Sequence, residues 1–187
     1  TEVEGAGEFP PTKSFEDDRD RWYLPVEGGV RSVVPGEPDR GWRQDTFGHH
    51  AGPLAYDAGV VVAAAASGEV YSFGMNGGGD WRTDLDDMVT LPPVVGSERV
   101  YVGTHEQVVA LERFDGGEAW RVPRPSTTPF ALDDGRLYTV HGDALVARSP
   151  RSGGKLWETR LAGSASTALA VGSDAVYVGT QVGDVQA

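Results

Sequence analysis

The chain has 187 residues, carries 28 acidic and 16 basic side chains for a net charge of −12, and contains no cysteine. This length allows one substantial core, and the lack of cysteine excludes disulfides and thiolate chemistry. No cluster of Lys and Arg is present, which disfavours a nucleic-acid partner, and no apolar run approaches the ~20 residues of a membrane-spanning helix.

The basic side chains are nearly all arginine, since Lys13 and Lys155 are the only lysines. An acidic surface of this kind is typical of proteins from salt-loving archaea, in which a high net charge maintains solubility. A GC-rich genome, which favours Arg, Ala, Val and Gly, is the alternative explanation. We interpret the charge as salt adaptation and expect a halophilic archaeal origin.

Residues 1–20 are rich in Glu, Asp, Gly and Pro, and this composition predicts a flexible, solvated leader or linker. The sequence starts with Thr1 rather than methionine, which is expected when an upstream signal or lipid anchor has been removed. We therefore expect an extracytoplasmic or cell-surface protein.

From residue 21 to residue 187 the chain divides into similar units. We place a partial unit up to about 45, whole units at about 46–84, 85–123 and 124–160, and an incomplete unit at 161–187. Unit 85–123 shows the pattern, with strands predicted at 93–95, 100–102, 108–111 and around Trp120, and turns between them. No long stretch has the 3.6-residue periodicity of a helix.

Tryptophans mark the repeat, because Trp42, Trp81, Trp120 and Trp157 are separated by 39, 39 and 37 residues. Four residues before the last three stands a glycine that follows Asn, Asp or Ser: Gly77, Gly116 and Gly153. Asn-Gly and Asp-Gly are strong hairpin signals, since both central residues of the favoured turn need positive φ. The Trp42 unit has Glu37 and Pro38 at the turn instead.

An aromatic strand position precedes each tryptophan by 19 residues and is occupied by Tyr23, Val62, Tyr101 or Tyr138. Tyr177 lies in the same context and predicts a further tryptophan at 196, nine residues past the last residue of the sequence. The shorter spacing before Trp157 falls in residues 123–129, where a loop can lose residues without a shift in strand register.

A period near 40 residues built from short strands predicts an all-β protein, a β-propeller of four-stranded antiparallel blades. About four to five blades are present, so the ring is incomplete. We expect a chain shortened relative to a full ring. Closure through another chain is the alternative, because an open propeller exposes edge strands that associate readily.

The repeat itself resembles the tryptophan-docking repeat of the pyrroloquinoline-quinone-type propellers. The resemblance covers about residues 42–187 and is carried by two stretches: Ala110, Leu111, Gly116 and Trp120, and then Ala147, Gly153 and Trp157. That family includes quinoprotein dehydrogenases and cofactor-free scaffolds such as the outer-membrane assembly lipoprotein. The resemblance implies that each tryptophan packs between neighbouring blades, where an indole buries ~150–250 Å².

All four histidines fall in predicted connections. His49 and His50 precede the first strand of unit 46–84, whereas His105 and His141 lie between the second and third strands of their units. Because these two kinds of loop share one face of a propeller, a histidine-lined metal or ligand site on that face is one hypothesis. Turns tolerate histidine, so we assign these residues only to a binding face and predict no metal site.

Other polar groups give no catalytic assignment. Asp84, Asp86 and Asp87 carry oxygen ligands of the kind Ca²⁺ needs, but a solvated acidic loop explains them. Ser164 and Ser166 lack a Ser-His-Asp pattern, and glycines 77–79 lack the Lys-Ser/Thr of a phosphate loop. A quinoprotein dehydrogenase would also need adjacent cysteines and a Ca²⁺ site of Glu, Asn and Asp, whereas the chain has no cysteine and one asparagine.

These observations favour a non-catalytic scaffold or binding module that presents loops to a protein partner and needs no cofactor. One alternative is a fragment of a dehydrogenase that binds pyrroloquinoline quinone and Ca²⁺ through other blades. A second is a ligand-sensing ectodomain. The fold alone does not separate the three.

Overall fold

The computed structural model describes residues 15–16, 21–46, 54–133, 135–172 and 175–186. It contains five antiparallel sheets, and within each sheet the strands follow one another in chain order. We call these sheets blades 1 to 5, and the interface between two neighbours a seam, so that seam 2–3 joins blades 2 and 3. The predicted all-β propeller fold is confirmed.

Blades 1 and 2 each have four strands. Blade 1 contains β1 (Phe15–Glu16), β2 (Trp22–Val26), β3 (Gly29–Val33) and β4 (Arg43–Asp45), with the short 3-10 helix η1 (Pro38–Arg40) before β4. Blade 2 contains β5 (Ala55–Asp57), β6 (Val60–Ala64), β7 (Glu69–Gly74) and β8 (Gly79–Asp84).

Blades 3 and 4 repeat this plan, and blade 5 has three strands within the described residues. Blade 3 contains β9 (Val89–Val95), β10 (Arg99–Thr104), β11 (Val108–Glu112) and β12 (Glu118–Val122). Blade 4 contains β13 (Ala131–Asp133), β14 (Arg136–His141), β15 (Ala144–Arg148) and β16 (Lys155–Arg160). Blade 5 contains β17 (Ala170–Val171), β18 (Val176–Gly179) and β19 (Val185–Gln186).

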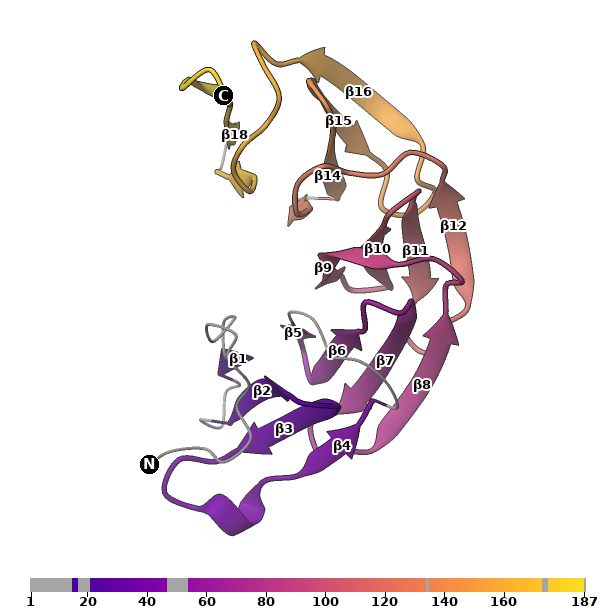
Figure 1. Cartoon of the computed structure of the whole chain (residues 1–187). Helices are drawn as coiled ribbons and strands as arrows, with labels where there is room; N and C mark the ends of the chain where they lie inside the picture. The colour runs from indigo at the N-terminus through magenta and orange to yellow at the C-terminus, as the bar shows by residue number, and fades with distance from the viewer. Residues whose placement is uncertain (1–14, 17–20, 47–53, 134, 173–174, 187) are drawn as a thin grey trace.

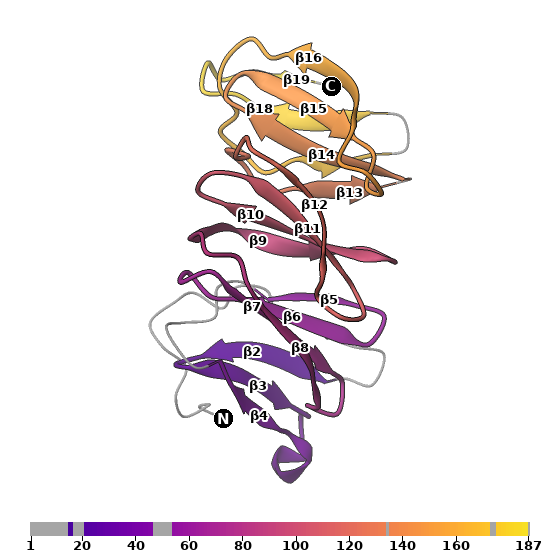
Figure 2. The same ribbon diagram turned by 90° about the vertical axis from the view of Figure 1, so that its right-hand side faces the viewer.

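The blades follow one another along an open arc, with the first strand of each on the inside and β4, β8, β12 and β16 on the outside (Figure 1). Seen from the side, the sheets stack one on the next (Figure 2). The described residues form no closed ring. Blades 2, 3 and 4 each bury two faces against neighbouring blades, whereas blades 1 and 5 each have one neighbour among the described residues.

The core is divided into four apolar clusters, one at each seam. Strand alternation produces this division, since successive residues of a strand face opposite sides of the sheet. In β10, Val100 and Val102 belong to the cluster shared with blade 2, whereas Tyr101 belongs to the cluster shared with blade 4. The same alternation sends Val61 toward blade 1 and Val62 toward blade 3.

Two features near the N-terminus differ from the sequence expectation. The stretch predicted as a leader contains the short strand β1, whose Phe15 pairs with Tyr23, so blade 1 is four-stranded rather than partial. The turn before Trp42, where the Gly signal is missing, contains η1 instead of a tight hairpin.

The glycine turns also differ from the predicted hairpin. Gly77, Gly116 and Gly153 have φ of 83°, 71° and 70°, but the residues before them do not share this conformation. The connection is longer than two residues, because the Gly116 amide bonds to the Glu112 carbonyl (2.9 Å). A loop of this length needs only its last residue in the left-handed region. The Asp115 carboxylate instead accepts from the Gly117 amide (2.9 Å), as Asx turns do.

Candidate functional site: the seams and the loops of one face

Three tryptophans reach across a seam to the turn of the following blade. The indole Nε1 of Trp42 donates to the Met75 carbonyl (2.8 Å), that of Trp81 to the Arg113 carbonyl (2.8 Å), and that of Trp120 to the Pro150 carbonyl (3.0 Å). Each acceptor lies in the connection between the third and fourth strands of the next blade. The indole thus gains a hydrogen bond as well as apolar burial.

The predicted turn glycines lie directly against these indoles. A Cβ on Gly116 would approach the Trp81 ring to 2.5 Å, and one on Gly153 would approach the Trp120 ring to 2.7 Å. Gly77 stands in the same relation to Trp42, at 2.7 Å. Two constraints therefore coincide at these positions, because the backbone has positive φ and the indole leaves no room for a side chain.

A second donor reaches the carbonyl of each turn glycine. Gln44 Nε2 donates to the Gly77 carbonyl (2.6 Å) and Thr83 Oγ1 donates to the Gly116 carbonyl (2.7 Å), both from two residues after the tryptophan. At seam 3–4 that position is Val122, which has no side-chain donor. The Gly153 carbonyl instead accepts from Arg148 Nη1 (3.1 Å), on the strand that precedes the turn.

The predicted tyrosines pack beside the tryptophans of their own blades. The ring centroids of Tyr101 and Trp120 are 5.9 Å apart, as are those of Tyr138 and Trp157. The Tyr101 hydroxyl donates to the Pro150 carbonyl (3.2 Å), which also receives Trp120. Burial raises the pKa of Tyr101 to about 12, so the phenol remains a neutral donor at physiological pH.

The last tryptophan and tyrosine of the repeat are the exception. Trp157 is 39% exposed and Tyr177 is 44% exposed, whereas Tyr101 is buried. Within the described part of the chain, no acceptor lies on Trp157 Nε1. Of the four repeat tryptophans, Trp42, Trp81 and Trp120 therefore bond to the turn of a following blade, and Trp157 does not within the described residues.

Sequence reasoning missed two buried arginines at the seams. Arg113 is 7% exposed and crosses seam 2–3, where it contacts the Asp57 carboxylate (2.8 Å) and the Asp57 and Gly96 carbonyls (both 2.7 Å). Arg148 is equally buried. Each stands at the end of an apolar run, where a charged residue is expected to be exposed to solvent, and its burial results from the stacking of blades.

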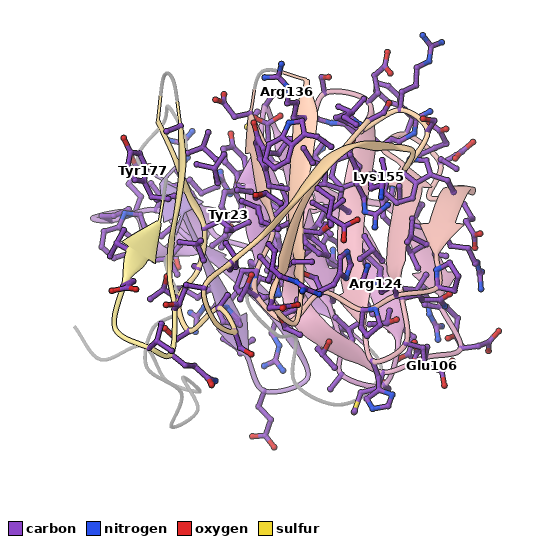
Figure 3. The ribbon with its side chains drawn as sticks, turned by 90° about the horizontal axis from the view of Figure 1, so that it is seen from above. Tyr23, Glu106, Arg124, Arg136, Lys155 and Tyr177 are labelled. Atoms are coloured by element: carbon purple, nitrogen blue, oxygen red, sulfur yellow. The ribbon has the colours of Figure 1, made fainter. Side chains whose placement is uncertain are left out.

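One face of the arc, which we call the loop face, is formed by the loops that connect the second to the third strand of a blade or one blade to the next. The fully described loops of this kind are residues 27–28, 65–68, 85–88, 105–107, 123–130, 142–143, 161–169 and 180–184. Viewed from above, Glu106 lies on this rim and Arg136 lies on the opposite rim (Figure 3). The arc therefore has two opposite rims, and the loop face is one of them.

Hydrogen bonds fix the loop face at seam 2–3. The His105 amide donates to the Met88 carbonyl (2.9 Å), and the Asp87 carboxylate accepts from Thr104 Oγ1 (2.5 Å) and the Glu106 amide (3.1 Å). The bond from Thr104 lowers the pKa of Asp87, burial partly opposes this, and the bond from the Glu106 amide lowers the pKa further. The side chains of His105 and Glu106 are exposed, and Met88 is 51% exposed.

The four histidines do not share one environment. His105 lies exposed on the loop face, as the binding-face hypothesis expects. His141 is the last residue of β14 and is 5% exposed, with Nδ1 2.7 Å from the Pro125 carbonyl. It is therefore buried within a seam rather than displayed in a loop. His49 and His50 lie outside the described residues.

The described residues contain no candidate metal centre. Among the described residues, no three His, Asp or Glu side chains lie close enough together to hold a metal ion. The Asp84 carboxylate accepts a local hydrogen bond from the Asp86 amide (3.0 Å).

No helix in the described part of the chain is long and apolar enough to cross a membrane.

Comparison with known sequences identifies relatives over most of the chain. The profile of a family described as outer membrane protein assembly factor BamB matches residues 26–126 and 104–187. The outer membrane protein assembly factor BamB of Burkholderia pseudomallei (strain K96243) is 25% identical over 145 residues, which cover 72% of this chain and 38% of that protein. The chain thus spans well under half of this relative.

Comparison with solved structures finds the same fold. BamB from Moraxella catarrhalis has a TM-score of 0.75 at 16% identity, over 94% of this chain and 62% of that one. A europium-containing methanol dehydrogenase has a TM-score of 0.65 at 13% identity, over 84% of this chain and 45% of that one. At these identities the likeness shows the fold alone.

Proposed function

The chain belongs to the BamB family of outer membrane protein assembly factors, and on this premise we propose that it is a non-catalytic β-propeller scaffold that binds another protein. The loop face is the proposed binding surface. Its loops are held by backbone bonds while side chains such as Met88, His105 and Glu106 extend into solvent. This combination carries the proposal, because rigid loops bind with little loss of conformational entropy.

The chemistry of the loop face at seam 2–3 fits a protein partner. Met88 offers a flexible apolar contact of the kind found at protein-binding surfaces, and 51% of it is exposed. Glu106 and His105 beside it supply polar contacts for the rim of an interface. We expect the partner to be a protein outside the cytoplasm, in line with the assembly role named for the relatives.

The docked tryptophans are the proposed source of rigidity. In this proposal Trp42, Trp81 and Trp120 each lock their blade to the turn of the next, through the indole bond and the glycine that the ring covers. The loops at both ends of a seam then move as one body. The repeat residues thus serve binding indirectly, through the scaffold and not through contact with the partner.

Site-specific photo-crosslinking in the native cells tests the proposal. A photoreactive residue replaces Glu106 on the loop face, and a matched one replaces Ser97, which is exposed on the opposite rim of the same blade. We expect a defined crosslinked protein from position 106 and none from position 97. Equal products from both positions, or none from 106 and a product from 97, would place the interface elsewhere.

The dehydrogenase alternative has its own measurement. A quinone enzyme is stabilised when its cofactor binds the native state, so its Tm rises when pyrroloquinoline quinone and Ca²⁺ are added. For the scaffold we expect no change in Tm and no new absorbance. A saturable rise in Tm would favour the dehydrogenase.

A further inference from the structure

Seam 3–4 contains a buried polar cluster at strand positions that hold Val102, Thr104 and Leu111 at seam 2–3. Thr139 and His141 on β14 and Arg148 on β15 are 0%, 5% and 7% exposed. The strand register places Arg148 opposite Leu137, just as Leu111 lies opposite Val100 in blade 3. A charged side chain therefore occupies a position that holds a leucine one blade earlier. The free-energy cost of burying its guanidinium must be offset by hydrogen bonds.

The contacts of this cluster require a neutral imidazole. His141 Nδ1 lies 2.7 Å from the Pro125 carbonyl, which only accepts, so Nδ1 carries the proton. Nε2 is then the acceptor, and it lies 3.2 Å from Arg148 Nη2 and 3.0 Å from Thr139 Oγ1. The guanidinium bonds further to Thr139 Oγ1 through Nε (3.3 Å) and to the Gly153 carbonyl through Nη1 (3.1 Å).

This network links two loops across the seam. On one side, Pro125 belongs to loop 123–130, which runs from blade 3 to blade 4 on the loop face. On the other side, Gly153 belongs to the turn that covers Trp120. His141 and Arg148 are the bridge between them. A change at Nε2 is therefore transmitted to both the loop and the docked tryptophan.

A proton on Nε2 would face donors and positive charge. Arg148 on β15 and Arg124 in the loop are the cations around His141, and Glu158 on β16 is the carboxylate that acts on it. Burial lowers the pKa of His141, and the two arginines lower it further, while the bond to Pro125 and the Glu158 charge oppose them. Burial also lowers the pKa of Arg148, which still stays charged.

We propose that His141 is a proton-sensitive latch: the neutral ring ties loop 123–130 to Arg148 and the Gly153 turn, and a proton on Nε2 drives the ring, with the loop bonded to its Nδ1, away from the guanidinium. The latch goes beyond the proposed function, because it concerns when a loop is held and not what binds it. A histidine whose pKa falls on folding binds more protons when unfolded. Its stabilising contribution is complete above its ordinary pKa of about 6.5 and is lost as the pH falls toward the folded pKa.

Nuclear magnetic resonance of the 187-residue chain between pH 8 and pH 5 tests the latch. The His141 ring signal, identified by its loss in His141→Gln, is expected to titrate below the ordinary histidine range. Over the same transition, hydrogen-exchange protection of the Thr127 amide, which bonds to the Val140 carbonyl (2.7 Å), is expected to fall about tenfold or more. The His105 amide at seam 2–3 is the internal control, and its protection should not follow this transition.

Two variants separate the latch from a purely structural role. His141→Gln keeps a neutral acceptor near Nε2, so Thr127 protection should no longer depend on pH. Arg148→Leu restores the blade 3 residue and removes the nearest cation, which should move the His141 titration toward the ordinary range. Thr127 protection that stays constant while His141 titrates, or a titration unchanged by Arg148→Leu, would overturn the proposal.

Discussion

Seams 2–3 and 3–4 fulfil the same backbone requirement with different side chains. Both present a glycine carbonyl that needs a second donor beside the docked indole. Seam 2–3 uses Thr83, from the strand that carries the tryptophan. Seam 3–4 has Val122 there and uses Arg148 from the following blade instead. The seam therefore conserves the acceptor and its geometry, while the donor is interchangeable.

The use of an arginine instead of a threonine as the donor has consequences, because a charged donor needs further partners. Thr83 satisfies its carbonyl alone, whereas Arg148 brings Thr139 and His141 into the seam. A glycine carbonyl held by a hydroxyl is indifferent to pH near neutrality, whereas one held by a guanidinium that also bonds to an imidazole is not. The comparison thus separates a fixed joint from one that protonation can change.

The largest expected effect comes from removal of a docked indole. Trp120→Ala loses burial at seam 3–4 and its bond to Pro150, so we expect unfolding to become easier by ~3–5 kcal/mol. Trp157→Ala is the matched control, since that ring is 39% exposed. It should cost less than about 1 kcal/mol in denaturant unfolding. Similar losses from both variants would mean that the following turn adds nothing.

A glycine pair isolates the close approach of the turn. Gly116→Ala places a Cβ 2.5 Å from the Trp81 ring at a φ of 71°, whereas Gly135→Ala meets nothing within 4 Å at a φ of 73°. Both variants strain the backbone by ~1–2 kcal/mol. Overpacking should cost Gly116→Ala a further ~1–3 kcal/mol. Equal unfolding free energies for the two variants would show that the Trp81 ring moves aside at no cost in stability.

Exchange of the donor tests the seam comparison itself. Arg148→Leu leaves the Gly153 carbonyl without its side-chain donor and should cost ~1–3 kcal/mol. Val122→Thr, added to Arg148→Leu, supplies a hydroxyl at the position of Thr83 and should recover ~1 kcal/mol. Denaturant unfolding of the single and double variants gives the difference. A double variant no more stable than Arg148→Leu would mean that the two seams are not equivalent.

The smallest expected effect concerns the net charge of −12, which belongs to the whole chain and not to one seam. Molar KCl screens the self-repulsion of an acidic surface, so the proposed salt adaptation predicts a higher Tm in molar KCl than in dilute buffer. Thermal unfolding of the wild type measures it. Equal Tm values in the two buffers would refute salt adaptation.

The repeat was predictable because its signals are local or periodic. Trp81 and Gly116 stand at fixed intervals in their units, and strands such as 100–102 were predicted from short apolar runs between turns. The turns were predicted in place but not in conformation, since the Asx bond of Asp115 allows a longer loop with one left-handed residue. The length of the loop, and not the Asp-Gly dipeptide, sets how many turn residues have positive φ.

The polar seam contacts were not predictable, because they join residues that only the stacking of blades brings together. Arg113 and Asp57 are 56 residues apart in the chain, and each looks like an ordinary surface charge in sequence. His141 was predicted to lie in a loop since it follows a strand, yet the strand continues through it and the next loop covers it. Burial at a seam depends on two blades at once.

Hydrogen exchange of the five indole N–H groups tests the docking of blades most directly. One nitrogen-correlated spectrum of the wild type reports on all five, so each serves as a control for the others. We predict slow exchange for Trp42, Trp81 and Trp120, whose N–H groups bond to the following blade, and fast exchange for Trp22 and Trp157, which are 42% and 39% exposed. Exchange at Trp120 as fast as at Trp157 would contradict the account.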